Sequence, residues 1–207
     1  MTIDMQLLHS ITFYILYVAA AGATFVVVER LIFYSVSLRE ARRLEAVLTH
    51  EIQHVSDLPE ALMARKSLPA GIVRDILTVK PALATRGDLE DFCESVYIAA
   101  KARLHHHVWI LDTVVTAAPL LGLLGTILGI IDTFSALAQS GVSDPAQVSR
   151  GIGTALYATA LGISVALYGL LFHNVFQIRI DAINDHIKIL LLRAGIGAPA
   201  NHTTAAE

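Results

Sequence analysis

Two threonines in long uncharged stretches are the residues whose chemistry first stands out. Thr126 lies in a run of 19 residues without Asp, Glu, Lys or Arg, and Thr159 lies in a run of 28 such residues. A hydroxyl donates one hydrogen bond and accepts two, so it can bind water, an ion or a polar side chain of a partner. Alternatively, each hydroxyl bonds the carbonyl four residues earlier in its own helix and serves packing only. The sequence leaves both interpretations open.

Residues 50–54, HEIQH, match the H-E-x-x-H pattern in which two histidines one helical turn apart hold zinc and the glutamate activates water. The pattern is short, and charged helices produce it by chance. It lies in a charged amphipathic stretch, with no obvious third ligand. A solvated helix face is therefore the favoured interpretation, and we predict no metal site, no catalytic residue and no enzymatic activity.

Three consecutive histidines, His105 to His107, precede Trp109 at the start of an apolar stretch. On one continuous helix, neighbouring residues point about 100° apart, so the three rings would not converge on one metal ion. We interpret them as interfacial residues, with Trp109 in the aromatic belt of a membrane protein. Proton uptake by one of them is the alternative.

The elements that position these residues are predicted to be membrane helices. The 207-residue chain is 55% hydrophobic and 16% charged, with a mean hydropathy of +0.60, whereas soluble domains carry about 25% charged residues. Three uncharged runs of 18 or more residues, 11–28, 113–131 and 151–178, are each long enough to cross a bilayer. The single cysteine, Cys93, excludes an intramolecular disulfide, and the net charge of −3 gives no reason to expect nucleic acid as a partner.

Lysine and arginine placement predicts the orientation. Residues 29–107 hold 11 of the 15 Lys and Arg residues, and the segment before the first span holds none. The positive-inside rule therefore places the N-terminus outside and the C-terminus in the cytoplasm. The predicted organisation is a periplasmic N-terminus (1–10), a first span (11–28), a cytoplasmic helical region (29–107), a second span (108–134), a periplasmic loop (135–150), a third span (151–178) and a cytoplasmic helix with a disordered tail (179–207).

The fold class predicted from these patterns is an all-α membrane protein with three transmembrane helices that extend into a cytoplasmic helical bundle. Apolar residues recur at helical spacing before the second span and after the third, namely Leu89, Phe92, Val96, Ala100 and Leu104, then Ile180, Ile183, Ile187, Leu190 and Leu191. The first of these stripes is expected to run without a break into the second span.

Small residues on the second and third spans predict close helix–helix contact. They are Gly122, Gly125 and Gly129 on one span, and Ala155, Gly162 and Ala166 on the other. Small side chains let helix backbones approach in lipid, where no hydrophobic force drives association. No carboxylate, lysine or arginine lies at mid-depth, although a proton relay normally needs an ionisable group there. If protons cross, a partner must supply the carboxylate.

The segments LDTVVTAAPLLGLLGTILGIIDTF (111–134) and GIGTALYATALGISVALYGLLFHNVF (151–176) together resemble the signature of the MotA/TolQ/ExbB proton channel family. Three spans with an outside N-terminus resemble its ExbB/TolQ branch. The resemblance implies a homo-oligomeric ring, a pentamer, in the bacterial inner membrane. The ring would enclose a dimer of ExbD- or TolR-like single-span partners, whose aspartate carries protons, and would drive a TonB- or TolA-like protein.

The resemblance also implies roles for individual residues. Thr126 and Thr159 correspond to the family's two pore threonines, and Pro119, Gly122 and Gly125 to its packing residues. Asp112 matches the acid of the L-D-T element, and Asn174 the asparagine after the third span. Thr154 departs from the family, because ExbB and TolQ commonly carry glutamate there. Asp132 stands where relatives often have asparagine, and either supplies an acidic ring at the periplasmic mouth or caps a helix end.

The function expected from the resemblance is that of a ring subunit of a proton-driven motor, with protons as the transported ion and no cofactor. The alternative is a membrane scaffold that holds a single-span partner without conducting.

Overall fold

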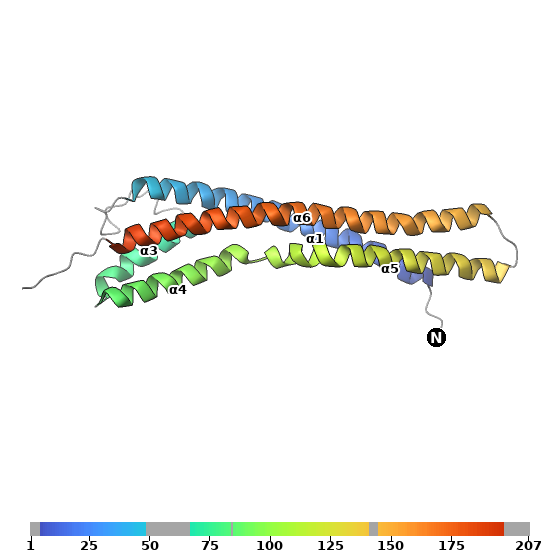
Figure 1. The fold of residues 1–207 in the computed structure, drawn as a ribbon, viewed down its shortest axis with the longest axis horizontal. Helices are drawn as coiled ribbons and strands as arrows, with labels where there is room; N and C mark the ends of the chain where they lie inside the picture. The colour runs from blue at the N-terminus through green and yellow to red at the C-terminus, as the bar shows by residue number, and fades with distance from the viewer. Residues whose placement is uncertain (1–4, 49–66, 84, 141–144, 197–207) are drawn as a thin grey trace, which may run out of the picture. The chain divides into compact units, whose positions relative to one another are not determined.

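Long uninterrupted helices dominate the computed structural model, which describes residues 5–48, 67–83, 85–140 and 145–196. The elements are helices α1 (Met5–Val47), α3 (Leu68–Val79), η2 (Lys80–Ala82), α4 (Arg86–His105), α5 (Val108–Ser140) and α6 (Pro145–Ile196) (Figure 1). No strand occurs in these described residues. The prediction of an all-α protein is confirmed.

Three of the helices, α1, α5 and α6, are long and apolar enough to span a membrane, which confirms the three predicted spans. In their most apolar windows, 28%, 33% and 33% of the residues are buried within the chain. The remaining apolar side chains, such as Phe25 and Leu120, face outward. In a membrane protein these faces contact lipid or other protein subunits.

The described residues divide into two compact units. Unit 1 is formed by 1–30 and 107–176, and unit 2 by 31–106 and 177–207. Helices α1 and α6 contribute to both units. The α5 and α6 helices extend into the segment 135–150 that was expected to be a loop, since α5 ends at Ser140 and α6 begins at Pro145.

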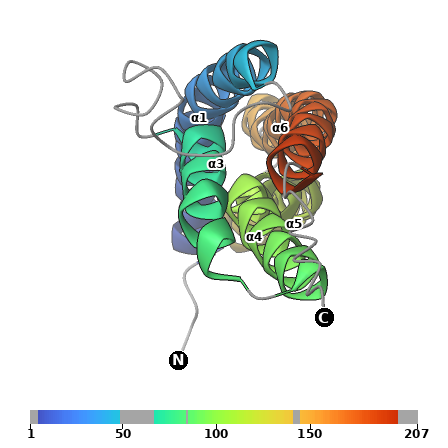
Figure 2. The same ribbon diagram turned by 90° about the vertical axis from the view of Figure 1, so that its left-hand side faces the viewer.

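Unit 2 is a helical bundle with an aliphatic core, and Figure 2 shows its helices α1, α3, α4 and α6 end-on. The predicted stripe after the third span is buried, with Ile180, Ile183 and Ile187 fully enclosed. Leu89, Ala100 and Leu104 of the stripe before the second span are buried as well. Burying an aliphatic side chain of this kind contributes about 1.5–3 kcal/mol relative to leaving it exposed.

Capping residues explain where the short helices of unit 2 begin. The Thr85 hydroxyl accepts from the Asp88 amide at 3.2 Å, and the Asp88 carboxylate accepts from the Thr85 amide at 3.0 Å. This reciprocal capping box satisfies amides that have no partner within the first turn of α4. Pro69 occupies the first turn of α3, where a missing N–H costs nothing.

Cys93, the only cysteine, is half-buried on α4. Burial raises the pKa of its thiol, and nearby Lys80 opposes that change only in part. Burial also lowers the pKa of Lys80, whose ammonium donates to the Ala194 carbonyl at 2.8 Å near the end of α6. A thiol with a raised pKa remains protonated at neutral pH, so Cys93 is not an activated nucleophile.

Candidate functional site

Small residues let α5 and α6 pack against each other in antiparallel fashion within unit 1. The contacts pair Gly122 with Gly162, Gly125 with Ala158, and Gly129 with Ala155, so that rising numbers on α5 meet falling numbers on α6. A Cβ added at Gly125 or Gly129 would lie within 3 Å of an alanine Cβ on α6. Glycine at these positions is therefore required for the observed separation.

The closest backbone approach occurs where Gly122 meets Gly162. A Cβ built on Gly122 would lie 2.9 Å from the Ala158 carbonyl oxygen and 3.1 Å from the Thr159 Cα. A Cβ on Gly162 would overlap the Ala118 carbonyl oxygen. Because the obstructing atoms are backbone, rotamer changes cannot relieve the overlap.

Beside this contact, the hydroxyls of Thr126 and Thr159 meet across the two helices and share a hydrogen bond. Thr126 also lies within hydrogen-bond distance of the Ala155 carbonyl (3.0 Å) and the Gly122 carbonyl (3.2 Å). Thr159 reaches the same Gly122 carbonyl at 3.2 Å. The two threonines, which we call the threonine pair, thus form one polar contact between the helices.

The threonine pair has unused capacity to accept hydrogen bonds. Two hydroxyls supply two protons and four acceptor lone pairs. Each hydroxyl proton can be donated to the Gly122 carbonyl, and that of Thr126 also to the Ala155 carbonyl. Only one of the two hydroxyls can donate to the other, so at most one of the four hydroxyl lone pairs is occupied within this group. Both side chains are half-buried, not sealed. The remaining lone pairs can accept a proton donor such as water or a protonated carboxyl group.

Helix α1 packs against α5 beside this contact. Thr12 of α1 approaches Gly125, and the His9 ring approaches Gly129, each on the α5 helix. Thr12 is 3% exposed and donates to the Leu8 carbonyl at 3.0 Å. The His9 ring packs edge-on against Phe13, and its buried Nε2 has no hydrogen-bond partner among the residues that the structure describes. The sequence reasoning missed both residues, although a histidine and a threonine three positions apart are a polar signal in an apolar helix.

Asp132 and Thr154 line one cavity of 260 Å³ together with Arg150 and Thr133. Asp132 is half-buried, whereas Thr154 is exposed and donates to the Arg150 carbonyl at 3.0 Å. The cavity lies beyond the threonine pair, toward the Ser140 end of α5. It therefore brings together an acid, a base and a hydroxyl that the sequence had placed only separately.

The other predicted site residues lie elsewhere on the two helices. Asp112 is exposed, 20 residues from Asp132, which corresponds to about 30 Å along a helix. Asn174 is exposed as well. Pro119 is half-buried inside α5, and Ala166 is buried on α6.

The consecutive histidines mark a joint between two helices, so the expectation of one continuous helix is wrong. Helix α4 ends at His105 and α5 begins at Val108. His107 between them has a φ of 68°, in the left-handed region that non-glycine residues seldom adopt. Its Nδ1 lies 3.1 Å from the guanidinium of Arg30, which is only 4% exposed, and 3.6 Å from the Glu29 carboxylate. These contacts hold the His107 side chain at the turn.

Metal binding finds no geometric support in the described part of the chain, where no cluster of three His, Cys, Asp or Glu residues could hold an ion. The HEIQH pattern lies outside the described residues, so its placement stays a prediction.

Comparisons with known proteins agree with the sequence signature. Residues 64–189 match the model of the MotA/TolQ/ExbB proton channel family. An ExbB-like biopolymer transport protein of Synechocystis sp. is 34% identical over 159 residues, 75% of each chain. The biopolymer transport protein ExbB of Pseudomonas putida is 31% identical over 69% of this chain, and the Tol-Pal system protein TolQ of Haemophilus influenzae is 36% identical over 40%. The matches span only 40% and 36% of the length of these last two relatives.

Proposed function

The chain belongs to the MotA/TolQ/ExbB proton channel family, and on that premise we propose that it is a subunit of a proton-driven motor in a bacterial inner membrane. In this proposal, copies of the chain form a ring around single-span partners of the ExbD or TolR kind. Proton flow past an aspartate of the partner would supply mechanical energy to a TonB- or TolA-like protein. One charge crossing 100 mV releases about 2.3 kcal/mol, which sets the scale of each step.

The observation that carries this proposal is the threonine pair. It lies between Asp112 and Asp132, in a part of α5 without Asp, Glu, Lys, Arg or His, and opposite a stretch of α6, residues 151–172, that also has none of these. A protonated partner aspartate could donate to one of the free hydroxyl lone pairs. After it loses its proton, the carboxylate could accept from the same hydroxyls, because a hydroxyl serves both roles. Such a site accommodates both protonation states without itself ionising.

The outward apolar faces of the helices support the oligomeric part of the proposal. Leu120, Leu123 and Ile127 on α5 and Leu156 and Ile163 on α6 are each at least 47% exposed in the isolated chain. A ring would bury some of these faces against neighbouring subunits and partner helices, and lipid would cover the rest. Asp132, half-buried in its cavity, would add negative charge at the periplasmic mouth of the ring.

Replacement of Thr159 by valine tests the role of the hydroxyl pair. Valine keeps the shape and removes the hydroxyl. Proton uptake into proteoliposomes that contain the chain with an ExbD- or TolR-like partner should fall about tenfold or more, because the partner carboxyl loses a hydrogen bond worth about 1.4 kcal/mol. Thr159→Ser, which retains the hydroxyl, should restore most of the uptake.

Thr24→Val is the matched control, since Thr24 is exposed on α1 and bonds only the Ala20 carbonyl at 2.8 Å within the described contacts. It should leave uptake unchanged. If Thr159→Val assembles normally and conducts as well as the unmodified protein, the pore role of the threonine pair is refuted. If the unmodified chain with its partner shows no proton uptake, a non-conducting scaffold for the partner helix becomes the better explanation.

A further inference from the structure

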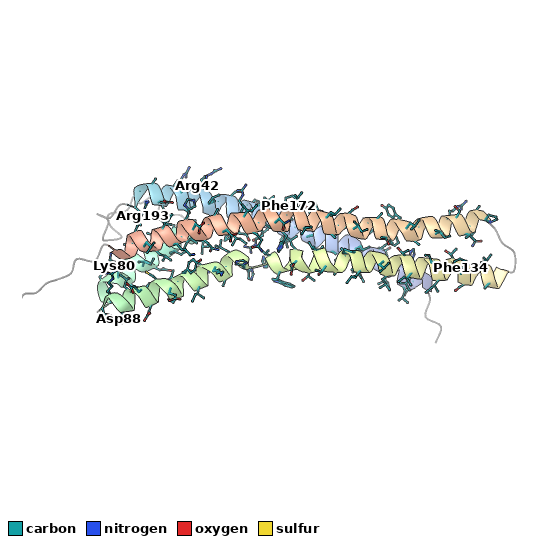
Figure 3. The ribbon with its side chains drawn as sticks, viewed as in Figure 1. Arg42, Lys80, Asp88, Phe134, Phe172 and Arg193 are labelled. Atoms are coloured by element: carbon teal, nitrogen blue, oxygen red, sulfur yellow. The ribbon has the colours of Figure 1, made fainter. Side chains whose placement is uncertain are left out.

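A basic cavity lies on the surface of unit 2, between α1 and α6. Its volume is 510 Å³, and the residues that line it include Arg39, Arg42, Arg43 and Arg179 and the exposed Ser35. Figure 3 shows Arg42 pointing away from the helices of the bundle. Three arginines come from one face of α1 and the fourth from α6, so two separate elements converge on the same positive site.

The positive charge of this cavity is largely uncompensated. No acidic residue is among the side chains that line it. Arg43 forms an ion pair with Glu40 at 3.3 Å, and Glu40 itself is buried. Arg39, Arg42 and Arg179 have no ion pair or hydrogen bond within the described part of the chain. Like charges held this close repel one another, so the site favours an anion that bridges them.

Exposed apolar residues lie directly beside the arginines on the side of the membrane spans. Ile32 is 62% exposed and Val36 is 50% exposed, on the same face of α1 as Arg39 and Arg43. On α6, Ile178 is 70% exposed and immediately precedes Arg179. Val36 and Arg39 are separated by about 4.5 Å along the helix axis. The surface therefore changes within one turn from hydrocarbon-like to cationic, on both helices.

From this juxtaposition we infer that the cavity binds the headgroup of an anionic phospholipid. Arginine forks match phosphate oxygens in bidentate geometry, and basic pockets beside membrane helices hold acidic headgroups. The Ser35 hydroxyl can donate a further hydrogen bond to the headgroup, while Ile32, Val36 and Ile178 contact its acyl chains. A soluble phosphate would contact the arginines alone, whereas a phospholipid would contact both the arginines and the exposed apolar residues beside them. The inference does not depend on proton transport.

Lipid retention by the purified full chain tests the inference. Delipidated protein in mild detergent is titrated with phosphatidylglycerol and, separately, with phosphatidylcholine, and bound lipid is counted by native mass spectrometry. We expect preferential retention of phosphatidylglycerol. We expect each arginine removed to weaken retention about fivefold. The double variant Arg39→Gln/Arg42→Gln should therefore weaken it about 25-fold, and Arg179→Gln on the other helix about fivefold.

The matched control is Arg74→Gln/Arg86→Gln, which removes the same charge from exposed positions outside the cavity. It should retain phosphatidylglycerol like the unmodified chain. Circular dichroism of each variant verifies the fold, and Arg179→Gln tests the site independently if the double variant does not fold. Equal retention of the two lipids, or equal losses in the cavity and control variants, would overturn the inference. Competition by glycerol 3-phosphate at the same concentrations would also overturn it, in favour of a soluble phosphate site.

Discussion

At the residue scale, the Gly122–Gly162 crossing determines whether the threonine pair can form. The two hydroxyls meet because the backbones of α5 and α6 are in contact one turn away, and the same Gly122 carbonyl lies near both hydroxyls. Any side chain at position 122 would push the helices apart and separate the hydroxyls.

Gly122→Ala should therefore destabilise the chain by about 1–3 kcal/mol, the usual cost of overpacking. The added methyl group would lie 2.9 Å from a backbone oxygen that no rotamer change can move. Thermal unfolding in detergent, followed by circular dichroism, measures the effect.

Gly153→Ala provides the control for this substitution, because nothing lies within 4 Å of the position where its methyl group would be placed. It should be neutral or stabilise α6 by up to about 1 kcal/mol. Equal destabilisation by both substitutions would show that the loss of glycine itself, and not the crossing, matters.

The sequence predicted which small residues and threonines lie on the second and third spans, but not how they pair. Two stripes of small residues can pack against each other in several helix registers that are about equally close. The contact between Thr126 and Thr159 could therefore not be predicted from the sequence and is known only from the structure. The joint at His107 was predicted wrongly because three histidines contain neither glycine nor proline, the usual breakers of helices. His107 at this joint contacts Arg30, 77 residues away in sequence, and no local pattern indicates such a contact.

At the element scale, the end of α1 is held to α6 by a cluster of charged groups. Arg193 donates to the Glu45 carbonyl at 2.5 Å and lies 3.5 Å from the Leu48 carbonyl, so it satisfies oxygens that the end of α1 leaves unpaired. The Glu45 carboxylate lies 2.6 Å from the His186 ring and 3.4 Å from Arg193. Figure 3 shows Arg193 near the end of α6.

Arg193→Gln should lower the free energy of unfolding by about 1–2 kcal/mol, because it removes charge-assisted hydrogen bonds to the terminal carbonyls as well as an ion pair. Arg86→Gln removes an ion pair with Glu90 on the surface of α4, where both side chains are more than two-thirds exposed. That control should cost about 0.5 kcal/mol or less. Chemical unfolding in detergent would reveal the difference, and similar losses for both variants would rule out a special role for the end of α1.

The spacing of apolar residues predicted which faces of the unit 2 helices are buried, but it did not predict the polar contacts between those helices. Ile180, Ile183 and Ile187 are buried, as their helical spacing predicted. They lie on one face of the helix, and an apolar helix face outside the membrane is removed from water by packing against the protein core. The Glu45, His186 and Arg193 cluster joins residues more than 140 positions apart, and no local signal relates positions so distant.

At the scale of the whole molecule, the distribution of basic residues predicts one orientation in the membrane. Residues 29–107 hold 11 of the 15 Lys and Arg residues, and Arg39, Arg42 and Arg43 lie close to the first span. Moving this segment across the membrane would be costly, so it should remain in the cytoplasm.

Alkaline phosphatase fused after residue 207 should therefore be inactive in a Gram-negative host, since this enzyme folds only in the periplasm, whereas green fluorescent protein at the same position should fluoresce. Phosphatase inserted between residues 141 and 144 should be active. The reverse pattern of activities would invert the predicted topology and, with it, the leaflet that the basic cavity faces.

The antiparallel packing of α5 and α6 also has a consequence for biogenesis. The contacts at the glycines of these two helices join residues 18 to 58 positions apart, whereas Thr12 and His9 of α1 reach α5 across more than 110 residues. Loop closure costs more as the loop lengthens. We therefore expect the α5–α6 hairpin to assemble as soon as both helices have left the ribosome, before α1 docks. The threonine pair would then be complete before α1 has packed against the hairpin to finish unit 1.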